Sequence, residues 1–422
     1  MLDRTIPPPI KSITDFILTK PSNLLLQNGM PAHFVAARVQ PIVSVQLIFE
    51  TGGSWFVPSV DVNHFTAKML LEGTQKHTST QFSTEIDGYG AFLEVGTAMD
   101  YASLDFQCLK KHLPRLLELA CELLTQATFP AQELDKLKTI AIQNIKINNQ
   151  KTSNIASNEL RAMLFGKDHP YGYTMTEESI AQIEIEQLKN HYPLSFFKQP
   201  FRLLAAGDIS EVEIKHIDNF LGKLAISDRA KKEVVHEKKY TTQSIYIEKD
   251  NAVQTSIRLG KHVLSRKDDD FVPLNVLNTI LGGFFGSRLM KNIREEKGLS
   301  YGISSSLGML KNAGYMVVGT DVKKELRQQA LDEIYKEIRK LAVEPVGEDE
   351  LNLVKSYIKG SFIGSLNTPF ALASRYLNIY THNLPEDYYD HQINRIDQVT
   401  SEKLLELAAK YYQDDFTEIM VG

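Results

Sequence analysis

The sequence is poor in the residues that build disulfide frameworks and cysteine-rich metal sites. Its 422 residues include two cysteines, Cys108 and Cys121, which do not have the short spacing of metal-binding or redox pairs. We expect both to pack as small apolar groups rather than to form a disulfide. The sequence therefore gives no indication of a disulfide-stapled domain or a cysteine-ligated metal.

Long hydrophobic runs and an excess of positive charge are also missing. No apolar stretch approaches the length of a membrane span, and residues 1–20, which include Pro7, Pro8 and Pro9, contain no run long enough for a signal peptide. The net charge is −5 and the pI is near 6.2, which gives no reason to expect nucleic acid or an anionic membrane as a partner. We expect a cytoplasmic protein, with a periplasmic location left open if a leader has been removed.

What is present is an ordinary globular composition in a long chain. A length of 422 residues is too great for one hydrophobic core, so two domains are the default. The stretch 223–240 is rich in charge and poor in large apolar residues, which makes it the best candidate linker. We predict an N-terminal extension over residues 1–22, a first domain over 23–222, this linker, and a second domain over 241–422.

Two segments far apart in the chain resemble each other. The run from Phe196 to Gly207 parallels the run from Tyr411 to Gly422, and the offset is 215 residues at both ends (411 − 196 and 422 − 207). The helical patterns just before the two runs also correspond. A repeat of this length indicates a duplicated domain, although two amphipathic helix–strand units can also resemble each other by chance.

Strand and helix patterns come in clusters rather than in strict alternation. Asn28-Gly29 between two short apolar segments is a hairpin signal, and residues 301–310 and 315–319 have the pattern of paired strands. Hairpins favour antiparallel pairing. We predict an α+β fold in which one unit, an antiparallel sheet with helices packed on one face, is used twice.

A short amphipathic helix is predicted around His64. Phe65 and Met69 would lie on its buried face, while His64 and Lys68 fall one turn apart on another face. The inverted zinc signature His-x-x-Glu-His needs two imidazoles at that spacing, with a glutamate to activate water. Here Ala67 and Lys68 occupy the glutamate and second histidine positions. Taken alone, a single histidine on such a helix is usually structural, and the lysine is usually a solvated side chain.

A second candidate site lies in the other half of the chain. A glycine-rich apolar segment precedes a helix that carries Arg294, and Tyr301 follows Gly298 where a strand is expected to start. Taken alone, Arg294 also fits a cation at a helix C-terminus, and Tyr301 a strand aromatic with a wet hydroxyl. The segment could contact an extended peptide or be a close-packed turn, and it has no phosphate-binding pattern. It consists of Gly282, Gly283, Phe284, Phe285 and Gly286.

The order of these motifs resembles the pitrilysin family of inverted-zincin metallopeptidases, which includes the insulin-degrading enzyme and the mitochondrial processing peptidases. In the first half the similarity rests on the glycines at 52–53, on the run from His64 to Thr74 and on Phe129. In the second half it rests on the run from Leu281 to Tyr301. It covers nearly the whole chain after about residue 22. The length is similar to that of the bacterial-type half-size members, which work as two chains.

The resemblance assigns zinc-site roles position by position. The first ligand corresponds to His64 and is kept, whereas the general base, the second ligand and the third ligand fall on Ala67, Lys68 and Asn144. Peptide hydrolysis by zinc needs protein ligands, an open position for water and a base. A lysine ammonium in place of a ligand also repels a divalent cation. The resemblance therefore implies a degenerate zinc site, with no metal in this chain.

The same resemblance implies a role for the second half. The family's Arg–Tyr pair, which binds substrate and steadies the oxyanion at the zinc site of another half, corresponds to Arg294 and Tyr301. We expect a subunit inactive alone that supplies this pair to a companion chain holding zinc, in a heterodimer that cleaves unstructured peptides. A homodimer is expected where the companion is absent.

Two other functions remain as alternatives. One is a structural scaffold of the same family with no role in proteolysis, against which the retained Arg–Tyr pair argues mildly. The other is an independent hydrolase with a relocated metal. It is disfavoured because His112, His169 and His191 have no partner at zinc-motif spacing.

Overall fold

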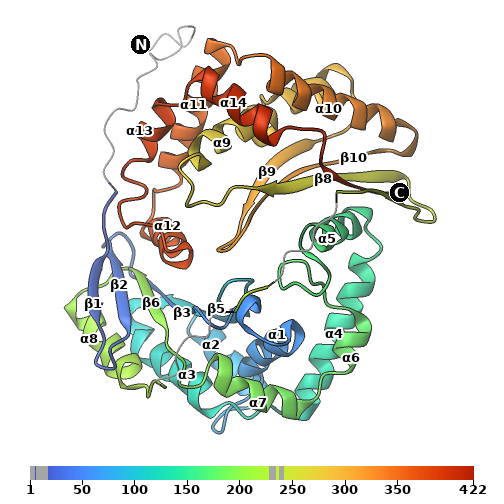
Figure 1. Cartoon of the computed structure of the whole chain (residues 1–422). Helices are drawn as coiled ribbons and strands as arrows, with labels where there is room; N and C mark the ends of the chain where they lie inside the picture. The colour runs from blue at the N-terminus through green and yellow to red at the C-terminus, as the bar shows by residue number, and fades with distance from the viewer. Residues whose placement is uncertain (1–4, 6–17, 228–233, 237–241) are drawn as a thin grey trace.

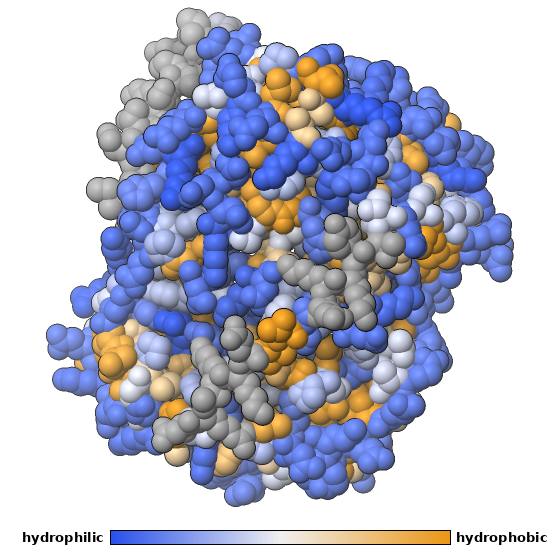
Figure 2. Space-filling view, viewed as in Figure 1, coloured by the Kyte–Doolittle hydropathy of each residue, from blue (hydrophilic) through white to orange (hydrophobic). Residues whose placement is uncertain are grey.

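The computed structural model of the chain describes residue 5 and residues 18–227, 234–236 and 242–422. Figure 1 shows two halves, one above the other, each made of a sheet and a layer of helices. On the face shown in Figure 2 most of the surface is hydrophilic, with smaller hydrophobic patches in both halves and near the boundary between them. Among the described residues, no helix is both long enough and apolar enough to cross a membrane.

The first half is built on a six-stranded sheet with the strand order β1-β2-β6-β3-β5-β4. The hairpin predicted at Asn28-Gly29 is confirmed: Leu25 pairs with Pro31, and Gly29 has a φ of 79°. The strands are β1 Ser22–Leu25, β2 Pro31–Ala36, β3 Ile42–Phe49, β4 Phe92–Thr97, β5 Ala102–Leu109 and β6 Arg202–Gly207. The helices are α1 Val60–Met69, α2 Ser79–Gly88, α3 Leu113–Gln126, α4 Ala131–Asn148, α5 Thr152–Phe165, α6 Glu177–Ala181, α7 Ile185–Ser195 and α8 Glu211–Phe220.

The second half is built on a five-stranded sheet with the strand order β7-β11-β8-β10-β9. Its strands are β7 Ser244–Ile247, β8 Gln254–Val263, β9 Ile303–Met309, β10 Gly314–Lys323 and β11 Thr417–Val421. Its helices are α9 Phe271–Asn278, α10 Arg327–Val343, α11 Glu348–Gly364, α12 Pro369–His382, α13 Gln392–Asp397 and α14 Ser401–Tyr411. Two wider helical turns, at residues 279–283 and 290–296, follow α9.

The two halves repeat the same order of elements. Strand β6 begins at residue 202 and β11 at residue 417, the offset of 215 that the sequence repeat has. The hairpin β4–β5 corresponds to β9–β10, and the helices α3, α4, α5 and α7 correspond to α10, α11, α12 and α14. The α+β class and the pair of similar units are therefore confirmed.

One feature of the sheets corrects the prediction. Each sheet was expected to be antiparallel, but β2 and β6 are parallel, and so are β7 and β11. The last strand of each half returns from a helix and inserts beside the first strands of the sheet. There β6 gains a backbone partner on both sides and buries residues 203–207.

Helices of each half cover one face of its own sheet, and a helix of the other half covers the opposite face. Helix α12 of the second half packs on β2 and β6, where Tyr376 and Tyr380 contact Val35 and Leu204 in one buried cluster. Helix α5 of the first half packs on β8 and β11. In Figure 1 both helices lie between the two sheets. This exchange makes the two halves one packed body.

The predicted boundaries between domains stay predictions. Most of the predicted linker, 223–240, and of the predicted extension, 1–22, lies outside the described residues. At the described end of the extension, Leu18 is buried with Tyr376, and the Tyr376 hydroxyl donates to the Thr19 carbonyl oxygen at 3.3 Å. Residues 18–19 therefore contact the second half.

Candidate functional site

Helix α1 is fixed in place by a buried asparagine. Ser59 caps the helix by accepting from the Val62 N–H at 3.3 Å. Asn63 is fully buried and donates to the Gly52 carbonyl oxygen at 2.8 Å. Its Oδ1 atom lies 2.9 Å from His191 Nε2 and 3.2 Å from Ser195 Oγ, both on α7. The helix is therefore tied to the loop before it and to α7.

The residues at the zinc-ligand positions do not form a ligand set. His64 is half-buried, and its pKa is lowered mainly by burial and also by Lys68, against an opposing effect of Asp61. Ala67 is buried and has no donor atom, and Asn144 is exposed on α4, which packs against α1. Among the described residues, no three His, Cys, Asp or Glu side chains are arranged to hold a metal ion. These residues do not fit a catalytic zinc.

Lys68 faces an acidic partner instead of a metal. Its Nζ atom lies 3.9 Å from Glu94 Oε1, and the two side chains are 39% and 76% exposed. Glu94 belongs to β4, the last strand of the first sheet. An exposed pair at this distance adds little stability, but it places a cation where the family resemblance puts a ligand.

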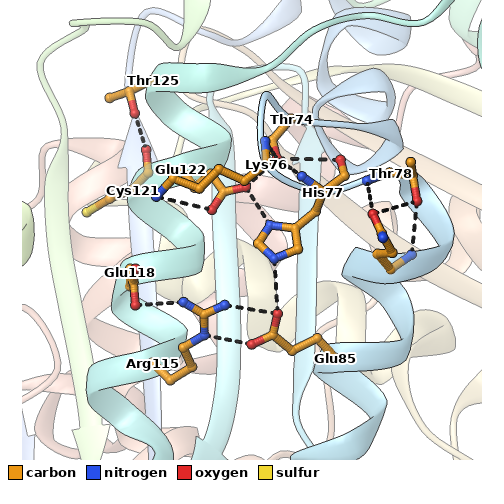
Figure 3. Close-up of polar contacts among 11 residues, drawn as sticks. Thr74, Lys76, His77, Thr78, Glu85, Arg115, Glu118, Cys121, Glu122 and Thr125 are labelled. Carbon is orange, nitrogen blue, oxygen red and sulfur yellow. Dashed lines mark hydrogen bonds and ion pairs between the residues drawn. The ribbon is translucent and has the colours of Figure 1, made fainter.

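A polar cluster that the sequence analysis did not single out lies beside the end of this helix (Figure 3). Glu122 on α3 is 2% exposed, and it accepts from the Thr74 hydroxyl and lies 2.7 Å from His77 Nδ1. His77 Nε2 lies 3.4 Å from Glu85 Oε2. Carboxylates therefore lie beside both ring nitrogens, and His77 is part of a side-chain network that holds the loop after α1.

Arg115 completes this cluster. It donates to both oxygens of Glu85, at 2.6 and 3.0 Å, and to Glu118 at 2.7 Å, and the bond from Arg115 lowers the pKa of Glu85. The network ties the loop after α1 to α2 and α3. The signal in the sequence was Glu122, a charged residue on the apolar face of a helix whose neighbours Leu119 and Leu123 are core residues.

In the second half the structure brings Arg294 and the glycine-rich segment together. The Arg294 guanidinium carbon lies 4.8 Å from the centre of the Phe285 ring, and Phe285 is 62% exposed. Phe284 packs on Tyr357 of α11 with the ring centres 4.9 Å apart. Gly282 is buried against β9, and a side chain there would meet the Ser305 backbone nitrogen at 2.5 Å. The segment is thus a close-packed turn at Gly282 and an exposed aromatic surface at Phe285.

Tyr301 projects from a turn, not from a strand. It was expected at the start of a strand, but β9 begins at Ile303. Ser300 Oγ accepts from the Gly302 N–H at 3.1 Å and donates to the Gly302 carbonyl oxygen at 2.8 Å, which bends the chain around Tyr301. The tyrosine is 93% exposed, the highest value among the exposed large hydrophobic residues.

The predicted residues therefore form two separate groups. His64, Ala67 and Lys68 lie on α1 in the lower half of Figure 1, whereas Tyr301 directly precedes β9 in the upper half. The first group offers no ligand set and no base. The second group offers the half-buried guanidinium of Arg294 and the exposed phenol of Tyr301, which are hydrogen-bond donors suited to carbonyl oxygens and oxyanions.

Comparison with known proteins assigns the chain to a family. The family described as Insulinase (Peptidase family M16) matches residues 37–177, and the Peptidase M16 inactive domain matches residues 182–358. The chain belongs to peptidase family M16. This confirms the family resemblance, since M16 matches cover both the α1 region and the Arg294 region.

Two relatives match along most of their length. The chain is 24% identical over 390 residues to "Uncharacterized zinc protease YmxG" of Bacillus subtilis, covering 90% of this chain and 93% of the relative. It is 22% identical over 382 residues to "Non-peptidase homolog YmxG" of Helicobacter pylori, covering 90% and 88%. The chain thus has about the length of these two relatives.

A solved structure supports the fold. The chain is similar to a crystal structure of a peptidase M16 inactive domain from Pseudomonas fluorescens, with a TM-score of 0.85 and 24% identity, over 95% of this chain and 97% of that one. At this identity the likeness shows a shared fold and carries no function.

Proposed function

We propose that this chain is the non-catalytic partner subunit of a two-chain M16 zinc metalloendopeptidase. A companion chain with an intact His-x-x-Glu-His would hold the zinc and the base, and this chain would supply Arg294 and Tyr301 in trans. The observation that carries the proposal is Tyr301, which is 93% exposed on its own chain and is therefore accessible to another molecule.

Arg294 would act as a charged donor in addition to Tyr301. Its contact with Phe285 fixes the guanidinium by one face and leaves N–H groups at its edge for a substrate carbonyl. Donors aimed at an oxyanion are worth about 3–4 kcal/mol each in well-formed sites. Together the two side chains would bind the peptide backbone and stabilise the charge that develops at the companion's zinc.

Open sheet edges support the substrate class that we propose. Within the described residues, β9 ends the second sheet and β4 ends the first, so each of these strands is paired on one side only. An extended peptide can add to such an edge through its backbone. This supports an unstructured peptide as substrate, lying along the residues that precede and follow Tyr301 or along the equivalent edge of the companion.

The degenerate zinc site of the first half supports the proposal that the companion chain, and not this chain, holds the zinc and the base. Ala67, Lys68 and Asn144 replace a base and two ligands, and Lys68 lies beside Glu94. Restoring a zinc site here would need several changes at once. We therefore propose that zinc belongs to the companion chain and that this chain has no peptidase activity alone.

A mixing experiment tests this proposal. The chain, the companion and an equimolar mixture would be assayed with an unstructured fluorogenic peptide, and the expected result is cleavage by the mixture with little or none by either chain alone. If the companion alone cleaves as fast as the mixture, this chain has no part in proteolysis and the scaffold alternative takes its place. Stoichiometric zinc in the isolated chain would contradict the assignment of a degenerate site.

A further inference from the structure

A cavity of about 740 Å³ opens in the first half, where β3 ends and β2 and β6 begin. Ile48 and Glu50 border it from the end of β3, and Phe201 and Arg202 border it from the start of β6. It differs from both groups of family-matched residues, because none of those residues lines it. A volume of this size is typical of sites that bind small ligands.

The walls of this cavity are mostly apolar. Ten of the fifteen lining residues are apolar, and Ile48 and Phe201 are 0% and 4% exposed. The rim includes Leu194 of α7, which is 45% exposed. Ile48 and Phe201 have almost no surface left to cover, so the stabilisation comes from the exposed Leu194 and the half-buried Phe56 and Val57, which a ligand would remove from water. The cavity therefore favours an apolar occupant.

The charged groups of the cavity are paired with each other. Arg202 donates to Glu50 Oε1 from Nε at 3.3 Å and from NH2 at 3.2 Å. Its NH1 group donates to His33 Nε2 at 2.9 Å, and its guanidinium carbon lies 4.8 Å from the Tyr380 ring centre. An ionic ligand would have to break these contacts. The described lining residues consequently offer no net charge to a ligand.

His33, which contacts Arg202 behind the cavity wall, and the lining residue His191 lie in surroundings that favour the neutral ring. His33 accepts from Arg202 at Nε2 while its Nδ1 lies 2.7 Å from Asn23 Oδ1, an arrangement that suits the neutral ring. Burial, and for His33 also Arg202, lowers the pKa of His33 and of the cavity-lining His191 to about 4. Among the described residues that line the cavity, an anion would find no unpaired cation.

We propose that this cavity binds a compact, uncharged apolar group the size of one or two leucine or phenylalanine side chains. The group can be presented by a peptide or by a free small molecule, since both have the same chemistry. The proposal concerns the isolated chain and does not depend on a companion subunit.

The single tryptophan of the chain reports on this cavity. Trp55 is 8% exposed, and its neighbour Phe56 lines the cavity. The Trp55 indole N–H donates to the carbonyl oxygen of Val234 at 3.2 Å, and Val234 is itself a lining residue. A ligand that contacts Phe56 or Val234 will change the surroundings of the indole. Trp55 emission can therefore be followed without a label.

The test is a titration of the full chain with three probes. N-acetyl-leucyl-leucinamide represents a peptide, 1-hexanol represents a free apolar molecule, and N-acetyl-lysyl-lysinamide is the charged control. We expect a saturable change in Trp55 emission, matched by heat in calorimetry, with the dileucine probe and none with the dilysine probe. If hexanol also binds, the site accepts free apolar molecules as well as peptides. If the dileucine probe binds and hexanol does not, the site is specific for peptides. No saturable binding of either apolar probe, or equal binding of the dilysine probe, overturns the proposal.

Two variants locate the binding. Leu194→Glu and Val57→Glu each place a carboxylate at the cavity and should weaken binding of the dileucine probe by about tenfold or more, because an unpaired charge resists burial. Val212→Glu is the matched control: Val212 is a 57% exposed valine on α8 that does not line the cavity. Unchanged affinity in both cavity variants, or an equal loss in Val212→Glu, contradicts the proposed site.

Discussion

Buried histidines of the first half make the stability of the protein depend on pH, because protonating them favours the unfolded state. His191 is 4% exposed, and burial lowers its pKa to about 4, well below the value of about 6.5 expected in the unfolded chain. Between these values the unfolded state binds a proton that the native state does not, so the free energy of unfolding falls as the pH is lowered through this window.

The resulting prediction is that acidification from pH 7 to pH 5 destabilises the protein partly through His191. The expected contribution of this residue is about 2 kcal/mol, measured by urea unfolding at the two pH values. The variant His191→Gln should be less stable at pH 7 but should lose less stability between pH 7 and pH 5. Equal losses in the two proteins would show that His191 is not the titrating group.

Gly282 is a second residue whose identity the packing dictates. A Cβ atom at this position would lie 2.5 Å from the Ser305 backbone nitrogen. We predict that Gly282→Ala lowers the free energy of unfolding by about 1–3 kcal/mol because the segment must move away from β9. Gly360→Ala is the control, since Gly360 lies inside α11 with open space around it, and it should be neutral or stabilising. Similar unfolding free energies for the two variants would contradict this reasoning.

Among the elements, helix α1 was predicted well from the sequence, but the contacts that hold it in place were not. Its apolar spacing predicted a helix with Phe65 and Met69 buried, and both are. What the sequence could not reveal is the anchor through Asn63, because its partners Gly52, His191 and Ser195 are brought together by tertiary packing. The glutamate–histidine cluster at Glu122 escaped prediction for the same reason.

This anchor gives the prediction for α1. Asn63→Ala removes the donor to Gly52 and leaves buried partners on α7 without their acceptor, so we expect a loss of about 1–3 kcal/mol in the free energy of unfolding. Asn190→Ala, at an exposed position of α7, is the matched control and should change stability by less than about 0.5 kcal/mol. Chemical unfolding measures both, and an Asn63 variant as stable as its control would refute the anchor.

The strands show a similar limit of prediction. Hairpin signals located β1–β2 and β9–β10, which are formed by neighbouring segments. The parallel pairs β2–β6 and β7–β11 join segments that are about 170 residues apart, and no local pattern in the sequence encodes them. Antiparallel sheets were expected because the sequence shows only the local hairpins, which are antiparallel, and not the distant parallel pairs.

For the whole molecule, the main structural finding is that α12 of the second half packs on the first sheet and α5 of the first half packs on the second sheet. The duplication was visible in the sequence as a constant offset, but the covering of each sheet by a helix of the other half was not. A polar contact adds to it: Asp100 accepts from the Tyr171 hydroxyl and, at 2.9 Å, from the Lys311 N–H. Asp100 therefore joins the β4–β5 turn to the β9–β10 turn.

We predict that Asp100→Ala weakens the joint between the halves. Loss of a charged acceptor for two buried or half-buried donors should lower the free energy of unfolding by about 2–3 kcal/mol, and hydrogen exchange should rise at the two turns. Asp269→Ala, at an exposed position, is the control and should leave both quantities unchanged. Unaltered exchange at Lys311 in the Asp100 variant would contradict a joint at this place.

The most direct test of the proposed function is the rate of peptide cleavage by the reconstituted pair when this chain carries Arg294→Ala and Tyr301→Phe. Loss of two oxyanion or backbone donors predicts a fall in kcat of at least about 100-fold, with the variant still binding the companion as tightly as the wild type. Arg339→Ala with Tyr246→Phe, two changes at other exposed positions, should leave the rate unchanged. Full activity of the Arg294 and Tyr301 double variant would contradict the role in trans that we propose.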